Sequence, residues 1–298
     1  MNNRIVFGPI LVLLLAPSIF AATTGRLCFT RGAYIFVREP NGVTKRVVKG
    51  RQPNISPDGK TIAFVTGKGE LLKSESHVHL IDVQTGKLRE ISSLTPYDSF
   101  GPLWSPDGRR LAVQLVMDQK GALATVDPRT GDFCVIPANL PRELAWLNSW
   151  TPDGNSLVLN DLEYVYQLTL SGQVLRKLSI KEMLGDVVIS SQTGFSFSPD
   201  GRFLLFDSAM VPDDVGIASI YLYNFTPGGL SRLTSDRLGA LDPQWIPGGT
   251  EIIFTGYVKG RYKPKSSLPY YAIYRISADG KNLTMIMRNA ENASYALQ

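Results

Sequence analysis

The chain has 298 residues, of which 44% are hydrophobic, and a formal net charge of +5. This length and composition support one large buried core, and the two cysteines exclude a small scaffold held together by disulfides. We expect the slight basic excess to be spread along the chain, where it would say little about partners.

Residues 1–21 have the pattern of a secretory signal peptide. Arg4 is their only charge, Ile5–Ala16 is continuously apolar, and Ser18–Ala21 offers a cleavage site. An uncleaved membrane anchor is the alternative, because Ile5–Ala22 is almost long enough to span a bilayer. Pro9 and Pro17 favour cleavage. We therefore expect a periplasmic or secreted protein whose mature domain comprises residues 22–298.

A short phrase recurs five times along the mature chain: an apolar or aromatic residue, a turn containing Pro and Gly, and then an apolar run. The prolines follow one another at steps of 49, 46, 47 and 48 residues. A fixed period of this size is typical of a repeat array or a propeller. The four full copies contain Pro57-Asp58-Gly59, Pro106-Asp107-Gly108, Pro152-Asp153-Gly154 and Pro199-Asp200-Gly201, and the degenerate fifth contains Pro247-Gly248-Gly249.

The phrase predicts a tight turn between two strands. Pro presets φ, Asp can bond to the local backbone, and Gly adopts positive φ without steric cost. The apolar run that follows suits a strand covered on both faces, as in a propeller blade. Each repeat then contains four strands, which in the second blade lie near residues 52–56, 60–66, 77–83 and 87–92.

The two ends of the chain complete one another in this scheme. Residues 26–50 contain three strand signals, Leu27–Thr30, Tyr34–Arg38 and Lys45–Val48, without a preceding turn phrase. The tail Ala293–Gln298 lies where the first strand of the next repeat would begin. We therefore predict an all-β, six-bladed propeller of four-stranded antiparallel blades, closed by a C-terminal strand that joins the N-terminal blade.

The turn phrase resembles the repeat of the TolB-like β-propeller family. Trp104-Ser105-Pro106-Asp107-Gly108-Arg109 and Ser56-Pro57-Asp58-Gly59-Lys60 match its W-S-P-D-G-[KR] signature. The resemblance covers nearly the whole mature chain and implies a TolB-type propeller, here without the α/β domain that precedes it in TolB. The same repeat occurs in propellers of prolyl-oligopeptidase-like peptidases and in other exported proteins, so it implies a fold rather than an activity.

No residue pattern in the chain predicts catalysis or a cofactor. Because the turn aspartates recur in each full copy, we interpret them as turn-forming residues rather than catalytic acids. Trp104, Trp150, Trp245 and Phe197 share one repeat position and are interpreted as inter-blade packing. The sequence has no G-x-S-x-G elbow, P-loop, dinucleotide fingerprint or EF-hand loop. We expect a protein that is not an enzyme and binds no cofactor.

Histidine and cysteine leave two smaller questions. His77 and His79 are two residues apart on a predicted strand, so they share a face and could bind a metal, but a solvated or packed pair is the favoured interpretation. Cys28 and Cys134 fall in the first and third blades, which should not touch. We expect two free, buried thiols and no metal site.

Long loops between second and third strands indicate where a partner would bind. The segments Thr66–Ser76, Ser208–Gly216 and Gly256–Pro269 should project from one face of the ring, and variable loops on a rigid scaffold often carry binding sites. The last of them is basic and aromatic, which is compatible with a solvated loop or with a site for an anionic partner. The candidate binding residues are Tyr257, Lys259, Arg261, Tyr262, Lys263, Lys265 and Tyr270.

These features together favour a monomeric, exported, non-catalytic propeller that serves as a protein–protein interaction scaffold in the cell envelope. Its partner would be an envelope protein, with an acidic protein or an anionic glycan as candidates, and nucleic acid is excluded by export. The alternative function is a glycan-binding or glycan-cleaving propeller. Clustered carboxylates at the channel mouth would favour cleavage, and aromatic platforms without them would favour binding.

Overall fold

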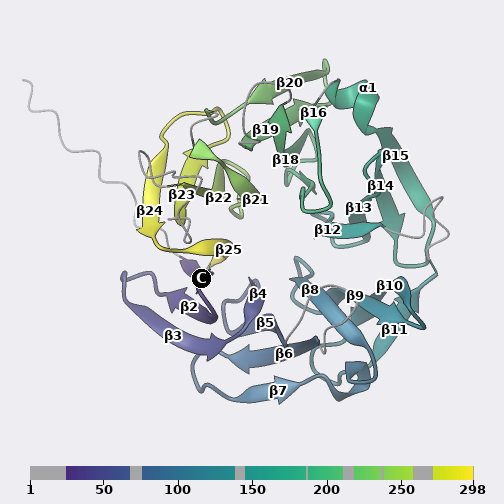
Figure 1. Cartoon of the computed structure of the whole chain (residues 1–298), viewed down its shortest axis with the longest axis vertical. Coiled ribbons are helices and arrows are strands. Elements are labelled where there is room, and N and C mark those ends of the chain that lie inside the picture. Colours follow the sequence, from purple (N-terminus) through teal and green to yellow (C-terminus); the bar gives the residue numbers. More distant parts are fainter. Residues whose placement is uncertain are drawn as a thin grey trace, which may run out of the picture.

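The computed structural model describes residues 25–67, 76–137, 145–185, 187–210, 218–235, 238–257 and 271–297. Six antiparallel sheets are arranged around a central axis in chain order, as the colours of Figure 1 show. The model therefore confirms the predicted six-bladed propeller. Within the described ranges, no helix is long and apolar enough to cross a membrane.

In each of the first three blades, four strands follow one another from the axis outward. Blade 1 comprises β25 (Glu291–Leu297), β1 (Gly25–Arg31), β2 (Tyr34–Arg38) and β3 (Thr44–Lys49). Blade 2 comprises β4 (Arg51–Ile55), β5 (Thr61–Thr66), β6 (His77–Asp82) and β7 (Leu88–Glu90). After the 3-10 helix η1 (Ser92–Leu94), blade 3 comprises β8 (Asp98–Trp104), β9 (Leu111–Met117), β10 (Lys120–Val126) and β11 (Phe133–Ile136).

The remaining blades follow the same order, with one addition in blade 5. Blade 4 comprises β12 (Trp146–Trp150), β13 (Ser156–Asn160), β14 (Tyr164–Thr169) and β15 (Val174–Ser179). Helix α1 (Ile180–Leu184) leads to blade 5, in which β16 (Val187–Val188) and β17 (Ser196–Phe197) both pair with β18 (Phe203–Met210), followed by β19 (Ser219–Asn224) and β20 (Gly229–Arg232). Blade 6 comprises β21 (Leu241–Trp245), β22 (Glu251–Tyr257), β23 (Tyr271–Ser277) and β24 (Thr284–Arg288).

The ring closes as the two ends of the sequence predict. Strand β25 pairs antiparallel with β1, with Gly25 opposite Leu297 and Leu27 opposite Tyr295. Its Ser294 Oγ also accepts a hydrogen bond of 3.1 Å from the backbone N–H of Ile55 in blade 2. The C-terminal strand therefore contacts both the blade it completes and the blade beside it.

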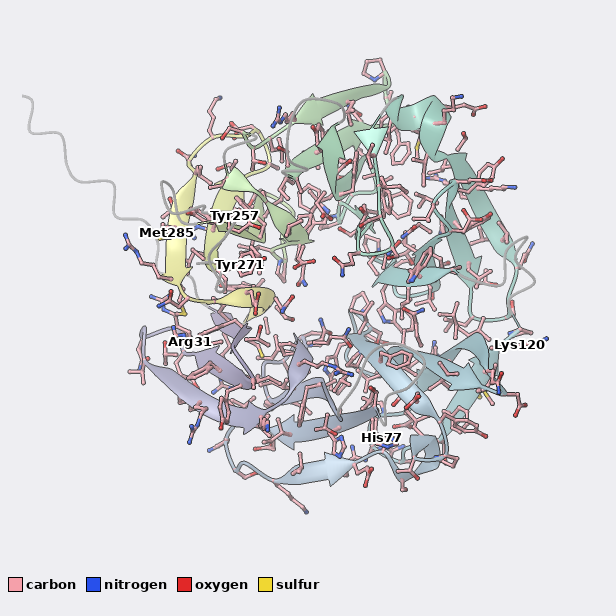
Figure 2. All side chains as sticks on the ribbon, viewed as in Figure 1. Arg31, His77, Lys120, Tyr257, Tyr271 and Met285 are labelled. Atoms are coloured by element: carbon pink, nitrogen blue, oxygen red, sulfur yellow. The ribbon has the colours of Figure 1, made fainter. Side chains whose placement is uncertain are left out.

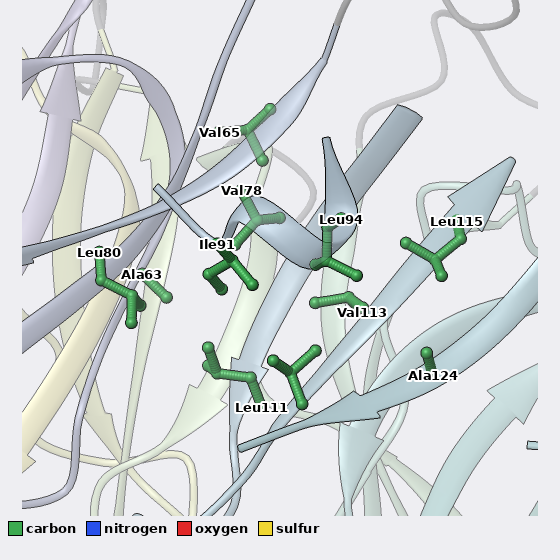
Figure 3. Packing of buried hydrophobic residues seen from close by; sticks show 11 residues of the cluster. Ala63, Val65, Val78, Leu80, Ile91, Leu94, Leu111, Val113, Leu115 and Ala124 are labelled. Carbon is green, nitrogen blue, oxygen red and sulfur yellow. The ribbon is translucent and has the colours of Figure 1, made fainter. Parts of the chain in front are cut away.

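The core lies between the blades, because each strand run is apolar on both faces. One cluster of buried apolar side chains fills each of the six interfaces between neighbouring sheets. Figure 3 shows the cluster between blades 2 and 3, in which Val65, Val78 and Ile91 face Leu111 and Val113. Each blade therefore depends on both neighbours for burial of its faces, and closure of the ring is required to cover the last pair.

The repeated aromatic residue links adjacent blades, in agreement with its interpretation as packing. Trp104 Nε1 donates to the backbone oxygen of Asn54 at 3.1 Å, and Trp150 Nε1 donates to that of Leu103 at 2.9 Å. At the joint between blades 5 and 6, the buried Nε1 of Trp245 has no partner among the described residues. In the described part of the chain, the interface between blades 5 and 6 therefore lacks the indole hydrogen bond that is present between blades 2 and 3 and between blades 3 and 4.

The two ends of the ring differ, and we name them for what they carry. The turn face carries the five turns between first and second strands, and the loop face carries the connections between second and third strands and from blade to blade.

The two cysteines are free, as expected. The expectation that both are buried is wrong for Cys134, which is exposed because β11 is the outer edge strand of blade 3.

Candidate functional site

The four turn aspartates are fully used within their own turns. Each carboxylate accepts a hydrogen bond of 2.6 Å from the Ser or Thr hydroxyl two residues earlier: Ser56, Ser105, Thr151 and Ser198. Each also accepts from the backbone N–H two residues later. The hydroxyl bonds lower the pKa of Asp107, Asp153 and Asp200, that of Asp200 to about 2. These carboxylates are ionised at neutral pH and are therefore poorly suited to proton transfer there.

The turns also touch one another around the turn face. A Cβ placed on Gly108 would lie 3.6 Å from Cδ of Pro57, and one on Gly154 would lie 3.4 Å from Cδ of Pro106. Both glycines have φ near 70°, a conformation that other residues adopt only with strain. Pro57, Asp58, Gly59 and their equivalents thus form a repeated structural layer.

Of the two histidines, only His79 has ring nitrogens in contact with polar neighbours among the described residues of blade 2. Nδ1 of His79 lies 3.2 Å from both Thr66 Oγ1 and the backbone oxygen of His77. Its Nε2 lies 3.9 Å from a carboxylate oxygen of Glu90, whereas the buried Nδ1 of His77 has no partner among the described residues. Across the described part of the chain, no group of three or more His, Cys, Asp or Glu side chains is arranged to hold a metal ion.

Of the predicted basic loop, only its first two residues, Gly256 and Tyr257, are described. Lys259, Arg261, Tyr262, Lys263, Lys265 and Tyr270 lie outside the described residues, so their role stays a prediction. Tyr257 ends β22, Tyr271 begins β23, and the two are paired across the hairpin. Their rings stack with centroids 5.1 Å apart, and Figure 2 shows them side by side on blade 6. The backbone of Tyr257 is fixed further by the Tyr274 hydroxyl, which donates to its oxygen at 2.9 Å.

Beside this tyrosine pair the structure brings together three carboxylates that sequence reasoning missed. Asp207 lies on β18, Asp242 on β21 and Glu291 on β25, so they come from blades 5, 6 and 1 in sequence around the ring. Asp242 and Glu291 begin axial strands at the loop face. We call these three residues the axial carboxylates.

The pKa values of all three carboxyl groups are raised by burial, and those of Asp207 and Asp242 are raised further by a neighbouring axial carboxylate. Burial raises the pKa of Asp207 to about 7, and the neighbouring Asp242 carboxylate adds to the effect. Burial and Glu291 raise the pKa of Asp242 to about 6, and burial raises that of Glu291. Asp207 is only 5% exposed and accepts a hydrogen bond of 3.3 Å from the backbone N–H of Gly194. Like charges held together away from water favour protonation or a counter-charge.

Two of the axial carboxylates also affect the tyrosine pair through Tyr271. The pKa of the Tyr271 hydroxyl is raised by burial, by a hydrogen bond with Tyr257, and by the charges of Glu291 and Asp242. Tyr271 therefore stays protonated beside the carboxylates. No ion pair involving an axial carboxylate is present within the described residues. The cluster therefore places carboxylates beside a stacked pair of tyrosine rings.

A repeat position explains how Asp242 reaches the axis. Gln52, Gly101, Asp242 and Asn292 all stand three residues before the axial aromatic or apolar residue and all have φ near 50°. Each lies at a register shift between the axial strand and its neighbour. In blades 2 and 3 the residues at this position bond to each other, since Gln52 Oε1 accepts a hydrogen bond of 3.0 Å from the backbone N–H of Gly101. The sequence signal that could have located this site is the charged residue, Asp242, at a bulge position that is uncharged in the other three blades that share it.

Comparison with known proteins shows the fold. No protein-family model matches the chain. The structure is similar to TolB propeller domains: TolB from Acinetobacter baumannii has a TM-score of 0.65 and 18% identity, covering 92% of this chain and 67% of that protein. An oligogalacturonate lyase in complex with manganese (TM-score 0.52, 14% identity, covering 86% and 70%) and the nidogen/laminin complex (0.58, 13%, covering 92% and 98%) share the architecture. The fold therefore occurs in an enzyme and in a binding complex alike.

Two curated relatives align with parts of the chain. One is the uncharacterized peptidase YuxL of Bacillus subtilis (strain 168), 27% identical over 177 residues, which cover 57% of this chain and 24% of that protein. The other is the uncharacterized protein Atu1656 of Agrobacterium fabrum (strain C58 / ATCC 33970), 25% identical over 214 residues, covering 69% of this chain and 65% of that protein. The chain thus spans about a quarter and about two thirds of the lengths of these relatives.

Proposed function

We propose that the protein is an exported, non-catalytic propeller that binds another protein of the cell envelope through its loop face. Export is inferred from the apolar segment that follows Arg4. A non-catalytic role is inferred from the absence of a catalytic motif in the sequence and from the use of the turn aspartates within their own turns. The rigid ring would present a preformed surface, so that little ordering cost accompanies binding.

The observation that carries the proposal is the set of axial carboxylates beside the Tyr257–Tyr271 pair. The pKa values of Asp207, which is buried, and of Asp242, which is partly buried, are raised by removal from water and by a neighbouring carboxylate. A basic side chain of a partner would relieve that repulsion and could also lie against the tyrosine rings, which attract cations through their faces. We therefore expect the contact to centre on the loop-face end of blades 5, 6 and 1.

The test is capture of partners from an envelope extract by the immobilised protein. The Asp207→Asn/Asp242→Asn variant should lose the specific partner, while Asp132→Asn, which changes an exposed carboxylate of blade 3, should retain it. Deletion of residues 258–270 tests the predicted basic loop separately. Equal recovery of the same partner by wild type and by Asp207→Asn/Asp242→Asn would place the contact elsewhere.

Glycan cleavage is the second candidate, because clustered carboxylates are the feature that would favour it. With pKa values of about 7 and about 6, Asp207 could serve as a proton donor while Asp242 is ionised near neutral pH. Release of reducing ends from envelope polysaccharide by the wild type, lost in both Asp207→Asn and Asp242→Asn, would establish an enzyme. Without any release, the binding proposal stands alone.

A further inference from the structure

The basic charge is concentrated in residues 25–51, which form β1 to β3 of blade 1 and begin β4 of blade 2, contrary to the expectation that it is spread along the chain. The whole chain has 31 basic and 26 acidic residues. Residues 25–51 contain only one carboxylate, that of Glu39, and seven cationic side chains: Arg26, Arg31, Arg38, Lys45, Arg46, Lys49 and Arg51. Glu39 binds Arg26 at 2.7 Å and Lys45 at 3.3 Å. The other cations have no carboxylate partner among the described residues.

Three of these cations share one face of the blade with aromatic rings. Arg31 and Lys49 both lie opposite Tyr34, and Arg46 lies opposite Phe36. Tyr34 and Phe36 are two residues apart on β2, so their side chains point to the same face, and the cations point with them.

Stacking on aromatic rings orders two of these cations, Arg31 and Arg46, without neutralising their charge. The Arg46 guanidinium lies 4.8 Å from the centroid of the Tyr34 ring, and that of Arg31 lies 5.1 Å from the centroid of Phe36. Arg31 also donates to the backbone oxygens of Asn289 and Arg288, which fixes it against blade 6 (Figure 2). Arg46 and Lys49 are exposed, and their N–H groups have no acceptor among the described residues. They remain available to an anionic ligand.

These two residues lie on an open strand edge. Strand β3 is the outermost strand of its sheet and pairs only with β2 in the described structure. Its outer backbone groups can therefore accept an added extended peptide. Cations on an edge normally oppose addition of another strand. A strand that carries carboxylates would instead be attracted, and its side chains on the shared face would meet Arg46 and Lys49.

We propose that the outer edge of blade 1 is a docking site for an extended acidic segment of a partner protein, which adds beside β3 and pairs its carboxylates with Arg46 and Lys49. This surface goes beyond the proposed function, because β3 and the axial β25 are opposite edges of the same sheet. The open backbone edge favours a peptide over an anionic polysaccharide or a lipid surface, neither of which can extend a strand ladder.

A fluorescein-labelled decaglutamate peptide is the probe, with binding measured by anisotropy on the full chain. We expect Arg46→Glu/Lys49→Glu to weaken binding by about tenfold or more, since two attractive contacts become repulsive. The matched control Lys87→Glu/Lys120→Glu makes the same change in net charge on blades 2 and 3 and should change affinity by less than about twofold. Hydrogen exchange should show new protection in residues 44–49 and none in 174–179, the outer strand of blade 4.

Several outcomes would overturn the proposal. Equal weakening by both charge reversals would show non-specific attraction, and unchanged exchange in β3 would show that no strand is added. Tighter binding of polygalacturonate or phosphatidylglycerol vesicles than of the peptide, lost in Arg46→Glu/Lys49→Glu, would assign the surface to those ligands. If that variant does not fold, Arg46→Gln/Lys49→Gln serves in its place. Because the probe is synthetic, the result does not depend on the axial carboxylates, and Asp207→Asn/Asp242→Asn should bind the peptide as the wild type does.

Discussion

The Arg26 guanidinium donates a hydrogen bond of 2.7 Å to the backbone oxygen of Gly59, across the joint between blades 1 and 2. At the next two joints, the glycine of a turn packs on the proline of the preceding turn. Blade 1 has no such turn, because its axial strand and its second strand are the two ends of the described chain. Arg26, which binds Glu39 at 2.7 Å, lies on the turn face where the turn of blade 1 would otherwise be. A side chain thus replaces the missing turn where the ring closes.

The first prediction follows from this contact. Arg26→Ala should lower the free energy of unfolding by about 2 kcal/mol, the cost of losing charge-assisted hydrogen bonds in a half-buried site. Arg109→Ala, which removes an exposed arginine of a turn, should change it by less than about 0.5 kcal/mol. Urea unfolding of both variants measures the difference. Similar values for the two would show that Arg26 does not stabilise the joint.

Removal of the closing strand should have a larger effect. Truncation after Asn292 exposes the edge of β1 and uncovers the buried Leu27 and Phe29 in the interface with blade 6. We expect aggregation or a markedly lower melting temperature, measured by circular dichroism and light scattering. Ser294→Ala is the milder comparison, because it removes only the hydroxyl that accepts from the Ile55 N–H and from the Asn54 side-chain amide, and it should cost about 1–2 kcal/mol. An unchanged melting temperature after truncation would contradict closure by β25.

The two thiols should differ in reactivity. Cys134 is exposed, whereas Cys28 is fully buried and burial raises its thiol pKa strongly. Maleimide should label Cys134 in the folded protein and Cys28 only after denaturation, because the thiolate is the reactive form. Mass spectrometry of the unreduced protein should find no intramolecular disulfide. Detection of a Cys28–Cys134 bond would contradict the placement of these residues in blades 1 and 3.

Stability should depend on pH through two sets of aspartates with opposite signs. The pKa of Asp207 is raised to about 7 and that of Asp242 to about 6, above the ordinary value of 3.8 for Asp. Their contribution to folding stability is therefore complete below pH 3.8 and is lost as the pH rises through 6 and 7. The turn aspartates have lowered pKa values, so their contribution to folding stability is present above pH 3.8 and is lost as the pH falls toward 2. Stability should therefore be higher at pH 5 than at pH 8.

A substitution isolates the first set. Asp207→Asn keeps an oxygen for the Gly194 N–H and removes the charge, so it should stabilise the protein by roughly 1–2 kcal/mol at pH 8 and by less at pH 5, where the folded-state carboxyl is protonated. Thermal melts across this range give the comparison. A wild-type melting temperature that rises from pH 5 to pH 8, or an Asp207→Asn variant that is destabilised at pH 8, would contradict the assignment.

The parts of this fold that sequence predicts are those that local chemistry determines. Each Ser/Thr-Pro-Asp-Gly turn forms its own hydrogen bonds, so the turns locate the strands, and the two incomplete ends of the chain locate the closing blade. The exposure of Cys134 was missed because a short apolar strand has the same pattern at an edge as in a core. The axial carboxylates were missed for a different reason. Asp207, Asp242 and Glu291 occupy unrelated sequence contexts, and only the order of blades 5, 6 and 1 around the ring brings them together.

The central claim is that the loop face binds a protein partner through the axial carboxylates. Its most direct measurement is the affinity of the partner captured from envelope extract for four purified proteins: wild type, Asp242→Asn, Glu291→Gln and Asp132→Asn. We predict that Asp242→Asn and Glu291→Gln each weaken binding by about tenfold and flatten its salt dependence, since each removes a charge from the contact, while Asp132→Asn matches the wild type. Four equal affinities with equal salt dependence would contradict the claim and remove the axial carboxylates from the binding site.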